Sequence, residues 1–222
     1  MKKLLFSILF IFTSFLVSAQ EEPKKKESFA DEFNREIKSI GKLNYKDYPM
    51  TIGIYGGPYF HTGSFYGLDF GGGAGIKFKF NFNKFLAISA DLGYTYASGK
   101  ENSYYNVYTY TSTSHMFDIR IMGVLQYETK KDKSGFVPWL GTGPVIAIAS
   151  TTQNSKYNYS DLYGSNTTAN AAGGYLGYIV ALGFRYNFKK AYTGLNFDYT
   201  IAAPGKADVS GIRLNAELGY RF

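Results

Sequence analysis

The stretch GIKFKFNF, from Gly75 to Phe82, alternates strictly between apolar and polar side chains. Its apolar positions are Ile76, Phe78, Phe80 and Phe82, and its polar positions are Lys77, Lys79 and Asn81. Successive side chains of a β-strand point to opposite faces, so a period of two predicts a strand with one apolar face. This stretch therefore predicts a β-protein.

The same alternation recurs along the rest of the chain. Together with 75–82, the predicted strands are 50–60, 86–94, 117–121, 136–149, 176–186, 195–201 and 212–222. Three prolines, Pro58, Pro138 and Pro144, are expected at a bulge or at the start of a strand, because proline removes a ladder hydrogen bond. Trp139 is expected at an interfacial aromatic position. The total of eight is an even number, as in bacterial outer-membrane barrels.

The connections alternate in length as the strands alternate in direction. The expected short ones are 81–84, 130–134 and 188–191, and the expected long ones are 61–72, 99–114, 152–174 and 203–211. Short periplasmic turns and long outer loops are typical of transmembrane barrels. The glycine run at 71–75 precedes a strand and not a helix, so it is expected to turn the chain and not to bind phosphate.

Alternation alone would also fit a soluble barrel. The bulk of the apolar face does not, because a soluble barrel would have to hold these side chains in its interior. Phe, Tyr, Leu and Ile occupy one face of nearly every predicted strand, too much volume for the interior of eight strands. The other face mixes small residues with charges, which is the lipid-facing arrangement. The predicted fold is all-β: an eight-stranded antiparallel up-and-down transmembrane β-barrel over residues 50–222.

Residues 1–20 have the layout of a secretory signal peptide. Lys2 and Lys3 precede an apolar run from Leu4 to Val17, and small residues follow. The run is shorter than the roughly 20 residues that span a bilayer as a helix. We therefore expect cleavage after residue 19 or 20 and secretion to the outer membrane.

Residues 21–49 are predicted to be a periplasmic leader that contains a short amphipathic helix over 28–41. Phe29, Phe33, Ile37 and Ile40 recur at helical spacing, with Ser28 as the N-cap. Docking on the periplasmic mouth of the barrel, a plug and a partner-binding helix all remain open for this segment.

Composition excludes several classes of function. The chain has no Cys, which excludes disulfides and thiolate metal sites. Its net charge of +7 comes from scattered Lys and Arg and not from one basic face, so no nucleic-acid partner is expected. No cofactor and no metal site are predicted either.

The polar face places nine charged residues in the predicted lumen. They are Lys77, Lys79, Asp91, Asp118, Arg120, Arg185, Asp198, Arg213 and Glu217. Eight strands leave room for side chains and little else, so these charges are expected to pair with one another. A narrow, porin-like conducting path is the alternative.

Two histidines, His61 and His115, fall near the expected outer ends of strands. With Asp69 or a loop serine either could form a surface site, as in a lipid-modifying enzyme, but no acidic partner stands at a recognisable spacing. We therefore predict no catalytic residue. The expected loops over 101–114 and 155–171 are rich in Tyr, Asn, Ser and Thr, a composition typical of contact surfaces. They are either solvated extensions of the strands or a site for a protein or glycan partner.

Three features resemble the outer-membrane β-barrel family that is widespread in Bacteroidota, with its PorT-like and porin-like members. They are the signal ending at Gln20, the motif VPWLGTGPV at 137–145, and the final LGYRF at 218–222. The resemblance covers residues 50–222 and implies an outer-membrane location in contact with lipid. Tyr220 and Phe222 look like the signal read by the barrel-assembly machinery. Family members share architecture and not one function, so the predicted role is that of a structural or interaction protein acting through its outer loops.

Overall fold

The computed structural model describes residues 28–38, 50–63, 69–102, 108–128, 134–157, 167–202 and 210–222. The predicted signal peptide at 1–20, the leader outside 28–38 and the tips of the long loops lie outside these ranges. The chain divides into two compact units, one up to Lys38 and one from Ser39 onward.

The first unit contains helix α2, Phe29–Lys38, within the predicted helical range. Ser28 caps its N-terminus, because the Ser28 hydroxyl accepts a hydrogen bond of 3.2 Å from the Ala30 amide. Asp31 and Glu32 lie in the first turn, and Arg35 and Lys38 in the last. This distribution of charge complements the helix dipole.

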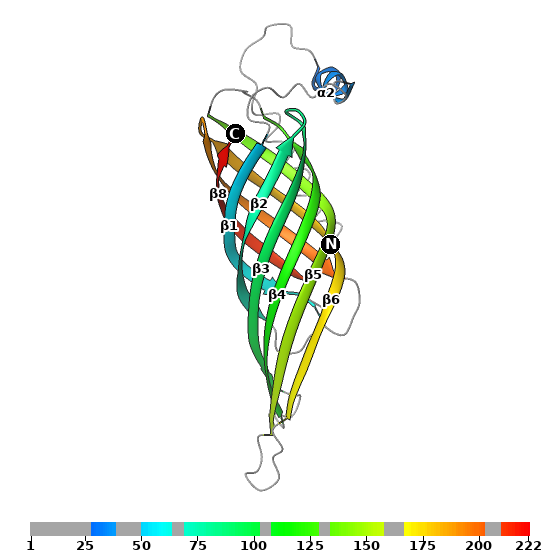
Figure 1. Ribbon diagram of the computed structural model, residues 1–222, viewed down its shortest axis with the longest axis vertical. Helices are drawn as coiled ribbons and strands as arrows, with labels where there is room; N and C mark the ends of the chain where they lie inside the picture. Colours follow the sequence, from blue (N-terminus) through cyan, green and yellow to red (C-terminus); the bar gives the residue numbers. More distant parts are fainter. Residues whose placement is uncertain are drawn as a thin grey trace. The chain divides into compact units, whose positions relative to one another are not determined.

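The second unit is a closed barrel of eight strands (Figure 1). The strands are β1 Met50–His61, β2 Phe70–Asn81, β3 Leu86–Asn102, β4 Tyr108–Gln126, β5 Gly135–Tyr157, β6 Thr167–Asn187, β7 Ala191–Ala202 and β8 Gly211–Arg221. Each strand pairs antiparallel with the next in sequence, and β1 pairs with β8 to close the ring. The predicted eight-stranded up-and-down barrel is confirmed.

Several strands are longer than the sequence predicted. The glycines at 71–75 belong to β2, opposite residues 93–97 of β3, and do not form the turn that precedes it. The expected loops 99–114 and 152–174 are also largely strand, because β3 to β6 continue to Asn102, Tyr108, Tyr157 and Thr167. Only residues 103–107 and 158–166 remain between these strands.

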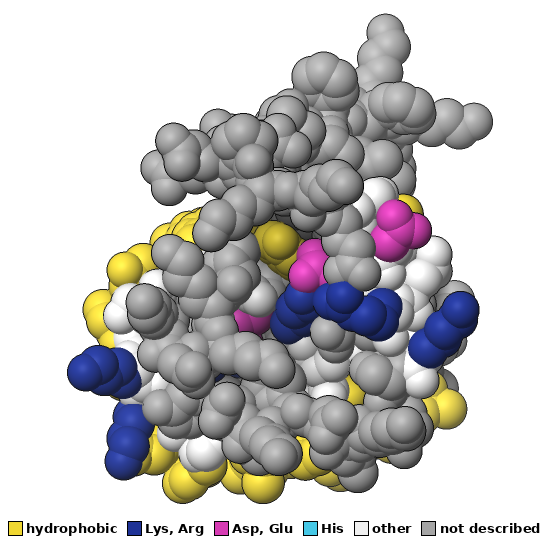
Figure 2. All heavy atoms as spheres, turned by 90° about the horizontal axis from the view of Figure 1, so that it is seen from above, with side chains coloured by type: hydrophobic (Ala, Val, Ile, Leu, Met, Phe, Trp, Pro, Cys, Tyr) yellow, Lys and Arg dark blue, Asp and Glu magenta, His cyan; other side chains and the backbone are white. Residues whose placement is uncertain are grey.

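The outer wall of the barrel is apolar. Ile54, Phe117 and Leu176 have exposed fractions of 62%, 62% and 67%. On β4 the outward residues from Phe117 to Leu125 are Phe, Ile, Ile, Gly and Leu, in alternation with buried ones. Figure 2 shows hydrophobic side chains along the circumference of the barrel end. We call this outward apolar surface the belt.

Each proline that the sequence placed in a strand lies where a ladder is interrupted or ends. The β1–β8 pairs skip Gly57 and Pro58, and the β4–β5 pairs skip Gly143 and Pro144. Pro138 lies just beyond the last β4–β5 pair, at Trp139. The missing amide of each proline is therefore tolerated at a gap in the ladder.

Both glycine–proline pairs bring two backbones close together. A Cβ atom built on Gly143 would overlap the carbonyl oxygen of Ile121, and one built on Gly57 would overlap that of Leu214. Backbone atoms in a closed sheet cannot move aside cheaply, so only glycine fits at these two positions.

Replacing Gly143 with alanine is expected to destabilise the barrel by about 1–3 kcal/mol, as overpacking does. Urea unfolding in phospholipid vesicles measures the loss. The matched control is Gly123→Ala on the facing strand, where a Cβ would meet its nearest atom at 4.0 Å and fits. Equal stabilities of the two variants would contradict the close approach at Gly143.

Candidate functional site

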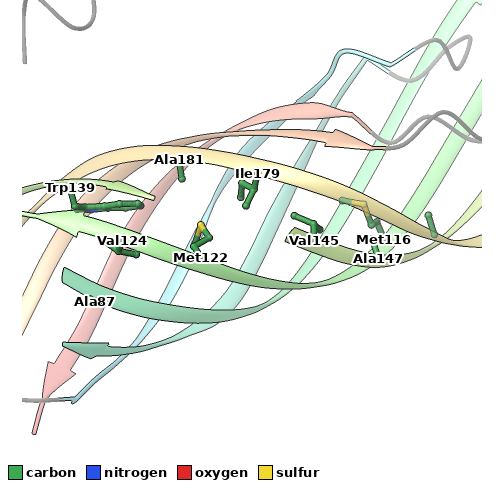
Figure 3. Close-up of a cluster of buried hydrophobic side chains, with 10 residues drawn as sticks. Ala87, Met116, Met122, Val124, Trp139, Val145, Ala147, Ile179 and Ala181 are labelled. Carbon is green, nitrogen blue, oxygen red and sulfur yellow. The ribbon is translucent and has the colours of Figure 1, made fainter. Parts of the chain in front are cut away.

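The lumen has an apolar wall made by β4, β5 and β6. Figure 3 shows its side chains pointing inward from these strands, with Ala87 contributed by β3. The buried members are Ala87, Met116, Met122, Val124, Trp139, Val145, Ala147, Ala149, Ile179 and Ala181. Apolar side chains thus occupy part of the interior wall, and β4 and β6 also point charged side chains into the lumen.

All nine charged residues predicted for the lumen are buried, each at 7% exposure or less. They come from β2, β3, β4, β6, β7 and β8. A buried charge is costly unless it is paired and hydrogen-bonded. The partners of these charges therefore distinguish a lumen filled by ion pairs from a conducting path.

Two arginines and two aspartates form the arginine–aspartate cluster: Arg120, Arg213, Asp118 and Asp198. The Arg120 guanidinium donates to both oxygens of Asp118, at 2.5 and 3.0 Å, and lies 3.4 Å from Asp198. Arg213 donates to Asp198 at 3.1 Å and to Asp118 at 3.3 Å. The cluster joins β4, β7 and β8 across the lumen, and its formal charges cancel.

The lumen also holds an ion pair between Lys77 and Glu217. The Lys77 ammonium donates to Glu217 at 2.9 Å and lies 3.9 Å from Asp91. The other oxygen of Glu217 accepts a hydrogen bond of 2.7 Å from the Tyr192 hydroxyl. Lys77 also lies 4.8 Å from the centre of the Trp139 ring, a cation–π distance. This pair therefore has both charged and aromatic support.

A third group surrounds Glu128, just past the end of β4. Glu128 accepts from Arg221 at 2.5 Å and from the Asn187 amide at 2.9 Å, and it lies 3.6 Å from Arg185. Next to it, the Gln126 oxygen accepts from Lys79 at 2.9 Å. These contacts tie β8 and β6 to the connection between β4 and β5.

Sequence reasoning missed several residues that contribute to these groups: Tyr192, Trp139, Gln126, Asn187 and Glu128. Trp139 is 6% exposed and faces the lumen, so its predicted interfacial position is wrong. Extending the period of two along and just past each strand would have found them, because they share the parity of the inward residues. Trp139 has the parity of Val137 and Gly141, and its ring type misled the prediction.

The contacts of the described residues give the two histidines different neighbours. The His115 Nδ1 atom and the Tyr94 hydroxyl are 2.7 Å apart on the outer wall. His61 lies at the end of β1, where its amide donates to the carbonyl oxygen of Asp69. In the described part of the chain no three His, Asp or Glu side chains gather as they would around a metal ion.

Four strands continue past the ring as a polar sheet. We define the protruding sheet as residues 99–102, 108–115, 150–157 and 167–174 of β3 to β6, the long strands in Figure 1. Hydroxyl and amide side chains bond across its strands, as between Thr168 and Asn154 at 2.8 Å and between Thr109 and Asn102 at 3.0 Å. Such cross-strand pairs stabilise a sheet that has no apolar core.

The protruding sheet has two unpaired edges among the described strands. The pairs of β6 with β7 begin at Gly177, so residues 167–176 pair with β5 alone. The pairs of β3 with β2 end at Ser98, so residues 99–102 pair with β4 alone. An unpaired edge exposes backbone donors and acceptors that can bind another strand.

Tyr220 and Phe222 lie on the outer wall at the seam between β8 and β1. Their ring centres are 5.0 Å apart, and the Phe222 amide donates to the carbonyl oxygen of Met50 at 2.9 Å. Arg221 between them points inward to Glu128. Their role as an assembly signal stays a prediction.

The described residues include no helix of the length and apolarity that a membrane-spanning helix needs. Comparison with family models gives no match, and no curated protein matches in sequence.

Solved structures resemble the barrel in fold. Neisserial surface protein A has a TM-score of 0.50 and 14% identity, over 78% of this chain and 97% of its own. The outer membrane protein OprG from Pseudomonas aeruginosa has a TM-score of 0.49 and 12% identity, over 80% and 98%. At this identity, the likeness to the neisserial protein shows the shared fold and no activity.

Proposed function

We propose that this chain is an integral outer-membrane protein whose lumen is closed and whose protruding sheet binds a protein partner outside the cell. The observation that carries the proposal is the contrast between the two parts of the barrel. Most of the buried lumen charges are paired, whereas β3 to β6 extend beyond the belt, and among the described strands residues 167–176 of β6 pair with β5 alone. An interaction protein needs such a surface and no pore.

The belt supports the location. Large apolar side chains such as Ile54 and Phe117 are more than half exposed on the outer wall, which water does not favour. A hydrocarbon environment favours such a wall, and in a closed barrel all backbone hydrogen bonds are made within the protein. The predicted signal peptide would direct the chain to this membrane. The short connections would face the periplasm and the protruding sheet the exterior.

The edge of β6 supports a protein partner over a glycan. A partner strand can add to residues 167–176 through backbone hydrogen bonds, which give affinity whatever the side chains are. The side chains there, such as Thr168 and Asn170, are exposed and small, so they leave the edge accessible.

A photo-activated cross-linking residue tests this proposal in living cells. Placed at Asn170 on the β6 edge, it is expected to capture one discrete protein. The matched control is Thr111, which is also exposed but belongs to β4, a strand paired on both sides and separated from β6 by β5. The same captured species from both positions, or none from Asn170, would contradict binding at the edge.

The closed lumen has its own test against the porin-like alternative. Purified protein in planar bilayers is expected to show no stable single-channel steps, because the lumen charges hold one another across the ring. Stable steps that disappear in Arg120→Met or Asp118→Asn would show a conducting path and overturn the closed lumen.

A further inference from the structure

Lys79 is a buried cation without a carboxylate partner. Its side chain lies in the lumen at 7% exposure, and within the described residues no Asp or Glu oxygen lies within 4 Å of its ammonium. Its one hydrogen bond goes to the neutral oxygen of Gln126, at 2.9 Å. Arg185 approaches the same oxygen at 3.5 Å. Two like charges thus converge on one neutral acceptor.

A small cavity lies next to these cations. Its volume is about 10 Å³, close to the space that a single water-sized particle requires. The residues that line it are Lys77, Lys79, Arg185, Ser89, Val124, Trp139 and Glu217. The lining therefore brings three positive charges to one small space and a single negative one.

Two buried donors of the lining have no acceptor among the described residues. They are the Ser89 hydroxyl and the Nε atom of Arg185, both in residues that are 2% exposed. A buried donor without an acceptor is destabilising, as is a buried charge without a counter-charge. An acceptor that carries negative charge and has the size of a water molecule would satisfy both.

We propose that this cavity, the Lys79 cavity, binds a small monovalent anion such as chloride. Lys79, Arg185 and Ser89 supply the donors, and Glu217 remains paired with Lys77. Chloride is larger than water, so its binding requires a small shift of the side chains that line the cavity. The bound ion neutralises part of the excess charge where the dielectric constant is low and attraction is strong.

Chloride dependence of stability tests the proposal on the mature protein folded in phospholipid vesicles. Chloride is exchanged for gluconate at a constant ionic strength of about 0.15 M, a level at which surface charges are well screened. The unfolding constant in urea is expected to fall with chloride in a saturable way, by roughly tenfold once chloride reaches ten times its Kd. Independence from chloride would overturn the site.

Two variants separate the site from a general salt effect. Lys79→Met removes the unpaired charge, so its unfolding constant is expected to be independent of chloride. Lys100→Met removes a lysine that is exposed on β3, so it is expected to keep the full dependence. The proposal is wrong if Lys79→Met responds to chloride as the parent does.

Bromide locates the ion directly. In crystals grown with bromide, an anomalous peak is expected within hydrogen-bond distance of the Lys79 ammonium and the Arg185 Nε atom. A bromide peak without any chloride dependence of stability would mean binding at crystal concentration only, and would overturn the proposal as a site occupied in solution.

Discussion

Replacing Arg120 with methionine is expected to destabilise the barrel by about 3–5 kcal/mol, the range for removing one partner of a buried ion pair. Asp118 would lose two hydrogen bonds and keep only Arg213, at 3.3 Å. Methionine keeps the length of the aliphatic part of the arginine side chain, so the loss comes mainly from the unpaired charge of Asp118. Urea unfolding of protein inserted in vesicles measures it.

The double variant Asp118→Leu with Arg120→Met is the control for this prediction. It removes one charge of each sign and leaves Arg213 paired with Asp198 at 3.1 Å. Replacing a whole buried pair by apolar residues is often neutral, so the double variant should recover most of the stability lost in the single one. If the double variant loses as much stability as Asp118→Leu and Arg120→Met lose together, then Asp118 and Arg120 do not stabilise the barrel as an ion pair.

Replacing Ile121 with arginine is the second change with a large expected effect. Ile121 is 47% exposed at the middle of the outward apolar residues of β4. If the belt lies in hydrocarbon, an arginine there costs about 2–4 kcal/mol. The measurement is the same unfolding equilibrium in vesicles, with insertion checked by the different gel mobilities of heated and unheated samples.

Thr111 provides the matched position for this second prediction. It lies on the same strand and the same outward face, but in the protruding sheet. Thr111→Arg is therefore expected to change stability by at most about 1 kcal/mol, the value for a charged substitution near the membrane interface. Equal losses at Ile121 and Thr111 would contradict a belt that is bounded by the membrane.

The barrel was predictable because an apolar outer wall and a charged interior impose a period of two on the sequence. GIKFKFNF at 75–82 and the last strand carry that pattern without a break. The ends of the long strands were not predictable in this way. Residues 108–114 of β4 and 150–157 of β5 are polar on both faces, so no alternation marks them as strand.

The faces of the charged residues followed from the same period, but their partners did not. Asp118 and Arg213 are far apart in sequence and lie on non-adjacent strands, and they meet because the ring closes. Glu128 lay outside the predicted strand, so its contacts with Arg185 and Arg221 were not expected. The stagger between neighbouring strands, called the shear, determines which side chains meet across the lumen. The alternation within a single strand carries no information about the shear.

The pairing of β1 with β8 separates this barrel from a simple row of hairpins. Seven of the eight neighbour pairs join consecutive strands, whereas the seam joins residues about as far apart as the barrel allows. Bringing distant segments together carries the largest loop-closure entropy, and long-range contacts slow folding. The seam is therefore expected to form last and to set the folding rate. Substitutions at the seam should slow folding more than equally destabilising ones within the β3–β4 hairpin.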